Sequence, residues 1–347
     1  MIRRTALIIV SIFTFVLSLQ MIQAGALPTA EILRPSNGPV ACLGLGWLLA
    51  CLVLSGSPVA ATSLAFLASD ILNVHESFAM IIGSRLGASF VVLAIGLIYQ
   101  TRSDGQGGGV YVGVLAFLIT ATVYLPAMAL GYICINTGWL DAIHVPGSFP
   151  LVSVIDQIFS PIVDLVIAGC DAASLPKWTL SVAGIGVMVF AFKLFDLTLP
   201  TGDPLGGRIG QMSRMIFRPS VAFLVGMLLT CITLSVSVSL ALLVPLTARG
   251  VIRRENLIPF ILGANITTFV DTLIFSLLID HPAAFALVLC SAVTVSAISL
   301  PVVFFIYRPY ERIIDEVAGV IVERRWRLTL FVLALFIVPV LLIVLPL

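Results

Sequence analysis

Charged residues are scarce in this chain of 347 residues: Asp, Glu, Lys and Arg make up 10% of it, whereas soluble domains carry about a quarter. Its three histidines are scattered and show no metal-ligand spacing, and its six cysteines form no disulfide framework. No Lys-Ser or Lys-Thr follows the glycine-rich segment Gly105–Gly109, so it is no nucleotide-phosphate loop. The net charge of +1 gives no indication of a nucleic-acid partner. These absences argue against soluble, nucleic-acid-binding and transition-metal proteins.

Apolar residues dominate instead, at 60% of the chain with a mean hydropathy of +1.18, which identifies an integral membrane protein. The first apolar run is read as a transmembrane helix, with a cleaved signal peptide as the alternative that stays open. The runs of about 20 residues that can each span a bilayer are Thr5–Gln23, Phe78–Ile98, Val110–Tyr132, Trp178–Phe195, Leu257–Ile279, Ala283–Tyr307 and Leu328–Leu345.

Two further uncharged stretches extend over positions 35–69 and 219–248. Both are too long for one crossing of a bilayer core of about 30 Å and too short for two. Each is interrupted near its middle by a cluster of small polar residues, Ser55–Pro58 in the first and Ser235–Ser239 in the second. We therefore expect each stretch to be a re-entrant helical hairpin, which enters and leaves the membrane by the same face.

The distribution of basic residues supports these hairpins. With a cytoplasmic N-terminus and both stretches re-entrant, 15 of the 18 basic residues lie inside, while Arg34 and Lys177 lie outside and Arg85 lies in the membrane. A single crossing at 219–248 would move the basic stretch 308–327 to the outside. We expect a multi-pass protein that resides in the cell's inner (plasma) membrane.

Part of the chain aligns without a gap on a later part of the same chain. When position 54 is placed on position 234, Leu54–Ser57 falls on Leu234–Ser237, and Gly83–Ser89 falls on Gly263–Phe269. Only seven of the 39 positions from 55 to 93 are identical, but polar residues coincide within apolar surroundings. Because the two hairpins open toward opposite faces, the repeats are predicted to be inverted, as in many transporters with a site between two halves.

The predicted fold is an all-α polytopic membrane protein with two inverted repeats, each a re-entrant helical hairpin followed by transmembrane helices. The expected units are an N-terminal helix and outer loop (1–38), a first repeat (39–132), an outer excursion with a transmembrane helix and inner linker (133–218), a second repeat (219–307), and a cytoplasmic linker with a C-terminal transmembrane helix (308–347).

Hydroxyl groups at helix breaks can replace the water shell of a substrate or an ion. Small polar residues also let membrane helices pack closely, and that alternative stays open. The predicted substrate ligands are Ser55, Ser57, Arg85, Ser89, Ser235, Ser237, Asn265, Thr267 and Thr268, and the predicted cation ligands are Ser239 and Asp271.

Arg85 and Asp271 are the ionisable residues best placed within crossings, and each costs about 2.5–3.5 kcal/mol at a helix centre. We expect Arg85 to attract an anion and Asp271 to help bind a cation. Two alternatives stay open: a salt bridge that locks the two halves together, or an Arg85 side chain that extends to the membrane surface.

These motifs resemble the type II sodium/phosphate cotransporter family, in which a Gln-Ser-Ser-Ser stretch precedes a Gly-Ala-Asn-Ile-Gly-Thr-Thr-like motif in each repeat. Gly263–Thr268 is a close match to the second motif, and Gly83–Ser89 is a degenerate first copy. Leu54 and Leu234 replace the family's glutamines. The other departures from the family pattern are Gly56 and Val236 at the middle serine, Arg85 at the asparagine and Thr267 at the glycine.

The resemblance implies a secondary active transporter that couples Na⁺ to a small anion, phosphate in the first place. It implies no enzymatic activity and no organic cofactor. The partners expected are the anion, the lipid bilayer, and a second copy or a membrane-complex subunit, but no nucleic acid. The replaced glutamines favour an alternative, a non-transporting membrane subunit or regulator that keeps the transporter fold.

Overall fold

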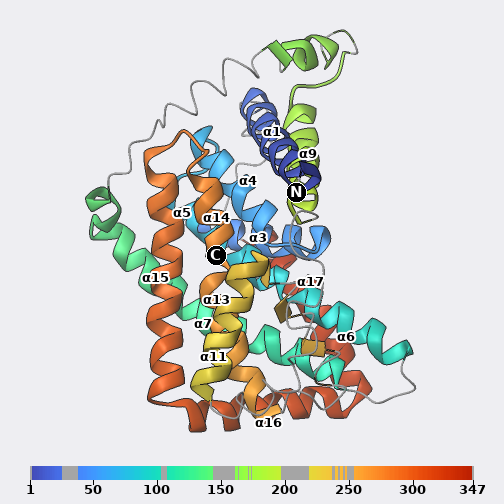
Figure 1. The fold of residues 1–347 in the computed structure, drawn as a ribbon, viewed down its shortest axis with the longest axis vertical. Coiled ribbons are helices and arrows are strands. Elements are labelled where there is room, and N and C mark those ends of the chain that lie inside the picture. Colours follow the sequence, from blue (N-terminus) through green and yellow to red (C-terminus); the bar gives the residue numbers. More distant parts are fainter. Residues whose placement is uncertain are drawn as a thin grey trace.

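The computed structural model describes residues 2–25, 38–102, 108–143, 161–162, 164–170, 172, 174–196, 219–236, 239–240, 243–244, 247 and 254–345. Within these ranges the regular structure is helical, with no strand (Figure 1). The elements are α1 (Ile2–Ala24), α3 (Gly38–Val53), α4 (Ser57–Ala68), α5 (Val74–Ala88), α6 (Phe90–Arg102), α7 (Gly109–Asn136), η1 (Trp139–Ala142), α9 (Trp178–Asp196), α11 (Pro219–Thr233), η2 (Arg254–Asn256), α13 (Leu257–Thr267), α14 (Phe269–Ser276), α15 (Pro282–Phe304), α16 (Tyr307–Glu323) and α17 (Arg325–Val344).

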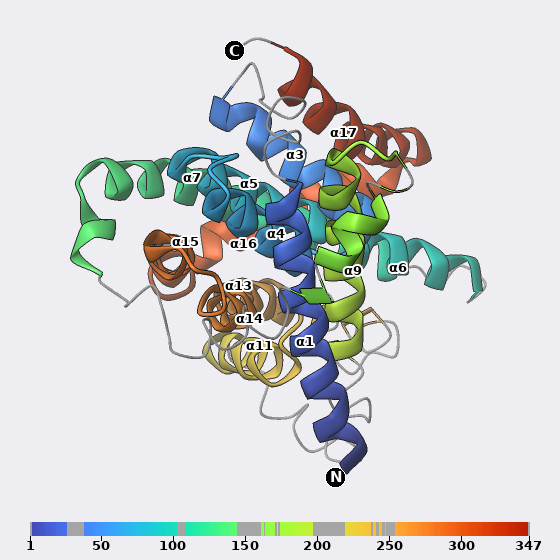
Figure 2. The ribbon, with the colours of Figure 1, turned by 90° about the horizontal axis from the view of Figure 1, so that it is seen from above.

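The described part of the chain contains five helical segments long and apolar enough to cross a membrane, as expected for a multi-pass membrane protein. Helices α1 and α9 lie side by side in both ribbon views (Figures 1 and 2). The five segments are Val74–Ile98, Gly109–Asn136, Arg254–Ser276, Pro282–Phe304 and Arg325–Val344.

Helix α3 runs parallel to α5 at very short range. Gly83 packs against Leu43 and Gly87 packs against Trp47, so both helices advance in the same direction, and a Cβ atom at either glycine would overlap backbone atoms. Helices α11 and α13 pack in the same way. Gly46 of α3 packs on the Met80 carbonyl of α5, and the equivalent Gly226 of α11 packs on the Phe260 carbonyl of α13. In the reverse direction, Gly83 packs on the Leu43 carbonyl and the equivalent Gly263 packs on the Phe223 carbonyl.

Helix α4 runs antiparallel to α5, so the chain reverses direction between α3 and α4. The hydroxyls of Ser63 and Ser77 each donate to the other residue's backbone carbonyl, at 2.9 and 3.3 Å. Ser57, at the start of α4, lies near Arg85 toward the end of α5. The group α3–α4–α5 thus brings the loop between α3 and α4 to the C-terminal end of α5.

Both stretches predicted to be interrupted do break, at equivalent leucines. Leu54 and Leu234 adopt left-handed backbone conformations, with φ of 58° and 47°. After the first, the Ser55 amide bonds the Ala50 carbonyl at 3.2 Å, which is typical of a helix that ends in a left-handed residue. The chain turns here despite a conformation that costs a residue with a Cβ about 1–2 kcal/mol.

Two of the expected crossings each contain a one-residue break in the regular helical pattern, although the segment continues in the same span. The break lies at Ser89 between α5 and α6 and at Thr268 between α13 and α14, and both residues keep right-handed helical backbone angles. The Ser89 hydroxyl donates to the Leu86 carbonyl at 2.6 Å, and the Thr267 hydroxyl donates to the Gly263 carbonyl at 3.3 Å. Such side-chain bonds compete with the helical ladder and favour a break in it.

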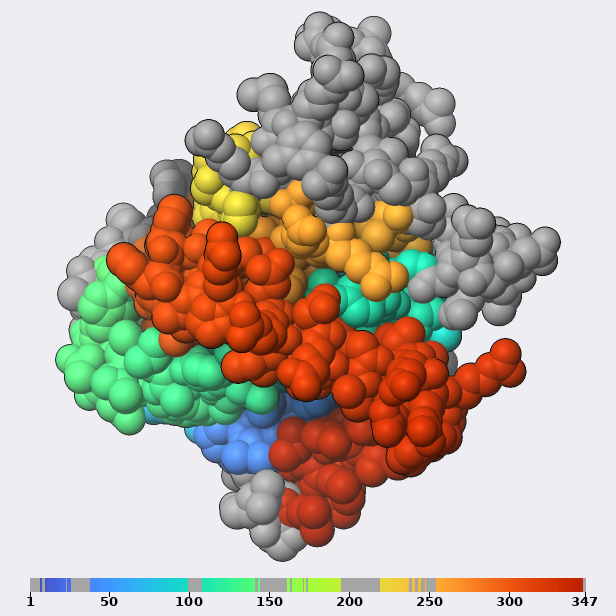
Figure 3. Space-filling view, turned by 90° about the horizontal axis from the view of Figure 1, so that it is seen from below, coloured from blue at the N-terminus to red at the C-terminus, as the bar shows by residue number. Residues whose placement is uncertain are grey.

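Most of 308–327, expected to be a linker, forms the amphipathic helix α16, which lies across the lower end of the molecule (Figures 1 and 3). Ile314 and Ala318 are four residues apart and are both buried. The Tyr310 hydroxyl also shares a hydrogen bond of 2.7 Å with Thr122 of α7. The helix follows from the apolar spacing, because Ile314, Val317, Ala318 and Ile321 recur at intervals of three and four residues, which share one face of a helix.

Candidate functional site

Arg85 is buried where the two predicted repeats meet, with 3% of its surface exposed. Its Nη2 donates to the Thr272 hydroxyl at 2.6 Å, and its Nη1 contacts the hydroxyls of Ser57 and Thr268, each at 3.4 Å. The guanidinium carbon also lies 4.9 Å from the centre of the Phe269 ring. The side chain of Arg85 therefore points into the protein interior and is held by groups from α4, α14 and the break before α14.

Asp271 is buried beside this cluster. Its Oδ1 accepts from the Thr272 amide at 2.5 Å and from the Thr272 hydroxyl at 2.9 Å, and the Ser57 hydroxyl lies near the carboxyl group. Arg85 and Asp271 form no ion pair within 4.0 Å. Instead, Thr272 stands between them, and its hydroxyl accepts from Arg85 while it donates to Asp271.

A small cavity of about 10 Å³ lies beside the guanidinium, with room for about one water molecule. The Nε atom of Arg85 is buried and has no hydrogen-bond partner among the described residues. The lining residues come from α5, α6, α7, α13, the two breaks and the segment after Leu234: Arg85, Ala88, Ser89, Val92, Thr120, Tyr124, Val236, Leu240, Asn265 and Thr268.

Asn265 and two residues of α7 form the polar wall of the cavity. The Asn265 amide nitrogen donates to the Thr120 hydroxyl at 3.4 Å, and the Tyr124 hydroxyl donates to the Asn265 backbone carbonyl at 2.8 Å. Sequence reasoning missed Thr120 and Tyr124. The signal was present, because two hydrogen-bonding side chains four residues apart share one face of an apolar crossing.

The turn between α3 and α4 reaches the site because residue 56 is a glycine. A Cβ atom at Gly56 would lie 2.9 Å from the Ser84 carbonyl oxygen, 3.0 Å from the Ala88 Cβ and 3.4 Å from Arg85 Nη1. The missing side chain lets the turn rest directly on α5. Ser57 is thereby brought within reach of the guanidinium.

The remaining predicted ligands of the first repeat contribute less directly. Ser89 lines the cavity, although its hydroxyl donates to its own helix. Thr267, in the second repeat, also donates to its own helix and is not among the lining residues. Ser55 is half-buried in the turn and does not line the cavity either.

The predicted ligands of the second turn form a separate oxygen cluster. The Thr233 hydroxyl shares a hydrogen bond of 2.8 Å with Ser239 and donates to the Ser235 carbonyl at 3.2 Å. Thr230, three residues earlier in α11, has a buried hydroxyl with no partner among the described residues. Ser237 lies outside the described residues.

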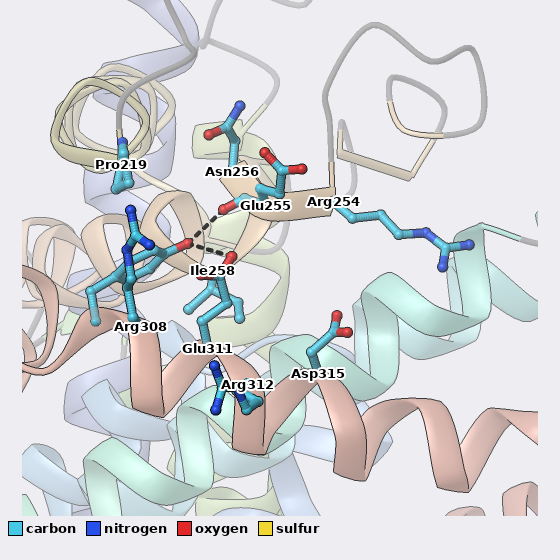
Figure 4. A pocket seen from close by; sticks show the side chains of 10 residues that line it. Pro219, Arg254, Glu255, Asn256, Ile258, Arg308, Glu311, Arg312 and Asp315 are labelled. Carbon is cyan, nitrogen blue, oxygen red and sulfur yellow. Dashed lines mark hydrogen bonds between the residues drawn. The ribbon is translucent and has the colours of Figure 1, made fainter.

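A larger hollow of about 560 Å³ opens between α16, η2 and the start of α11 (Figure 4). The Tyr307 hydroxyl donates to the Glu255 carbonyl at 2.6 Å and to the Glu311 carboxylate at 3.1 Å. Burial, and then the nearby carboxylates, raise the pKa of Glu311, while Tyr307 and Arg308 lower it. The hollow contains none of the predicted ligands; it is lined by Pro219, Arg254, Glu255, Asn256, Ile258, Tyr307, Arg308, Glu311, Arg312 and Asp315.

Residues 205–315 match the model of the Na⁺/Pi-cotransporter family, which supports membership of the chain in that family. The matched range covers about a third of the chain and includes Asn265, Thr268 and Asp271. Arg85 lies outside the matched range. No curated protein and no solved structure matches the chain.

Proposed function

We propose that this chain is a Na⁺-coupled symporter of a small anion, with inorganic phosphate as the first candidate, and that the anion binds in the cavity beside Arg85. One observation carries the proposal. A permanently charged guanidinium is buried next to a small cavity that has Ser89, Thr120, Asn265 and Thr268 in its otherwise largely apolar wall, and its Nε–H group has no partner among the described residues. The family match at 205–315 supports both Na⁺ and phosphate.

The groups around the cavity suit an oxyanion. A guanidinium presents N–H groups in a planar fork that matches the oxygen spacing of phosphate or carboxylate. The Asn265 amide and the Thr268 hydroxyl add neutral donors on the cavity wall. Away from bulk water, such charge-assisted bonds are stronger than at a surface.

The coupling cation has its best ligands at the second turn. Na⁺ is bound in transporters by freed carbonyls and hydroxyls at broken helices. The hydroxyls of Thr233 and Ser239 and the Ser235 carbonyl converge there within hydrogen-bond distance. Asp271 is the second predicted cation ligand, and its carboxylate faces Thr272 and Ser57.

Two inverted repeats with re-entrant hairpins would give the anion access from both sides. The opposite directions of α5 and α13 support this arrangement. The start of α5 lies at the end of α7, where Phe78 packs on Gly131, whereas the start of α13 lies at the beginning of α7, where Arg254 stacks 5.0 Å from the Tyr111 ring centre. The basic residues favour a cytoplasmic N-terminus, and the plasma membrane remains the location proposed for the transporter.

Transport then requires the cavity to open, since it has room for about one water molecule. A movement of one repeat against the other would widen it alternately toward each side. Coupling follows when cation and anion together stabilise the conformation that can change access.

The test is uptake of labelled phosphate into proteoliposomes with and without an inward Na⁺ gradient. We expect uptake that depends on the gradient and that falls about tenfold in Asn265→Ala, since a bond to a charged ligand contributes about 1.5–3 kcal/mol. Asn136→Ala is the matched control, because Asn136 pairs with His75 at the far end of α7.

Uptake that is absent, or that responds neither to the gradient nor to Asn265→Ala, would contradict the proposal. It would favour the alternative of a membrane subunit that keeps the fold without transport. Leu54 and Leu234, which stand where the related family has glutamine, are the feature that favours this alternative.

A further inference from the structure

The contacts of the Arg85 guanidinium are those of a bound cation. Three hydroxyl oxygens, of Ser57, Thr268 and Thr272, lie 3.4, 3.4 and 2.6 Å from its terminal nitrogens. They come from the start of α4, the break before α14 and α14 itself. The face of the Phe269 ring covers the guanidinium. Together these groups form a cage of oxygen and aromatic surface around one positive charge.

The compensating negative charge is Asp271. It lies behind Thr272, whose hydroxyl accepts from Arg85 and donates to the carboxylate. Ser57 lies near both charged groups, since its hydroxyl accepts from Nη1 of Arg85 and is close to the Asp271 carboxyl group. A buried carboxylate is strongly destabilised without a cation nearby. The chain supplies that cation from its other predicted repeat.

Hydroxyl oxygens beside a carboxylate are also the ligands that a small alkali cation prefers. We propose that Arg85 is a tethered cation that replaces one exchangeable Na⁺ ion at Asp271, so that part of the positive charge facing the anion never dissociates. This inference rests on the proposed function for its role in transport, though not for its test. The site keeps that charge at every Na⁺ concentration, because arginine is not deprotonated in proteins.

The alternative is that Arg85 has only a structural role and holds the two predicted repeats together. Both roles predict that the loss of Arg85 lowers the stability of the folded protein. They differ in what happens to the vacated cage. If Arg85 is a tethered cation, the vacated site should bind Na⁺ from solution as long as Asp271 is present. If Arg85 has only a structural role, the vacated site should not bind Na⁺.

The experiment measures thermal unfolding of the purified full chain in detergent, in NaCl against choline chloride at equal ionic strength and without phosphate. Arg85→Asn should gain a Na⁺-specific rise in Tm of about 2–4 °C beyond any rise in the wild type. The added rise should disappear in Arg85→Asn combined with Asp271→Asn. Arg85→Lys, which keeps the positive charge, should show no added rise.

The inference is overturned if Arg85→Asn responds to Na⁺ no more than the wild type does, or if the added response survives the loss of Asp271. Arg85→Gln serves the same test should Arg85→Asn not fold. Because phosphate is absent, the outcome is separate from that of the uptake assay. An added Na⁺-specific rise in Tm without phosphate uptake by the wild type would contradict the proposed function alone. Phosphate uptake without that rise in Tm would contradict this inference alone.

Discussion

Arg85 donates a hydrogen bond of 2.6 Å to the Thr272 hydroxyl across 187 residues of sequence. The same hydroxyl donates to Asp271 at 2.9 Å, so one small side chain serves a cation and an anion from the two predicted repeats. A direct ion pair would occupy one or two of the five N–H donors of the guanidinium with the carboxylate. With Thr272 between them, the two charges stabilise each other while the guanidinium keeps one side on the cavity.

Replacement of Thr272 by valine should therefore be costly for its size. The hydroxyl is lost, and both charged groups lose a bond, each worth about 1.5–3 kcal/mol. We expect the free energy of unfolding in mixed micelles to fall by about 2–4 kcal/mol. Thr329→Val is the matched control, because the Thr329 hydroxyl is exposed and bonds only its own helix. An equal effect of both variants would show that the Thr272 bonds matter little.

The close helix crossings predict a sharp response to a single methyl group. A Cβ atom at Gly46 or Gly226 would overlap a backbone carbonyl oxygen of the partner helix. Alanine at either position should lower stability by about 1–3 kcal/mol, since a backbone contact cannot yield as a side chain can. Gly319→Ala in α16 meets nothing within 4 Å and should be neutral or slightly stabilising. Thermal unfolding of the three variants measures these differences in stability. Equal Tm values would contradict the close backbone contacts at Gly46 and Gly226.

The left-handed conformation of Leu54 predicts an unusual tolerance of glycine. Relief of that strain is worth about 1–2 kcal/mol, whereas glycine within a helix costs about 1 kcal/mol. Leu54→Gly should thus be more stable than Leu52→Gly by about 2 kcal/mol. The two side chains are comparably exposed, at 49% and 65%. If both substitutions destabilise equally, Leu54 is not left-handed in the folded protein.

His281 predicts a loss of stability in mild acid. Its Nδ1 accepts from the Ala283 amide at 3.2 Å at the start of α15, and burial lowers its pKa from the usual value of 6.5, against the opposing effect of Asp70 and Asp280. The unfolded chain binds the proton at His281 more readily than the folded chain does. The contribution of neutral His281 to the free energy of unfolding is therefore complete above pH 6.5 and is lost as the pH falls below that value.

The matched variant is His281→Asn, which can keep the bond to the Ala283 amide without titrating. Tm should fall less for His281→Asn than for the wild type when the pH is lowered from about 7.5 to about 5.5. Parallel curves for the two proteins would show that His281 does not titrate in this range.

Local signals in the sequence predicted the helical membrane architecture and both interruptions. Long uncharged runs identify membrane segments because a bilayer accepts little else. The serines after Leu54 and Leu234 indicated breaks, since polar groups cluster where a buried helix opens. The resemblance at Gly263–Thr268 also indicated the family that the match at 205–315 supports.

The one-residue breaks at Ser89 and Thr268 were not predicted, and neither were Thr120 and Tyr124 on the cavity wall. Apolar segments hide such features, because hydropathy does not report the local regularity of a helix or the direction in which a side chain points. The helix over most of 308–327 was overlooked for a different reason. The many charged residues of this segment predict a solvated linker, whereas the regular spacing of its apolar residues indicates a helix.

The sequence by itself determined that this chain lies in a membrane, that its two halves share a pattern of polar residues, and which of those residues are too costly to bury without a reason. Only the tertiary structure decided that Arg85 meets Thr272 rather than Asp271, and that α7 closes the cavity. The physical reason is that these contacts depend on the direction and closeness of packed helices. Glycines set that packing at contacts between distant segments, whereas hydropathy records only the local environment.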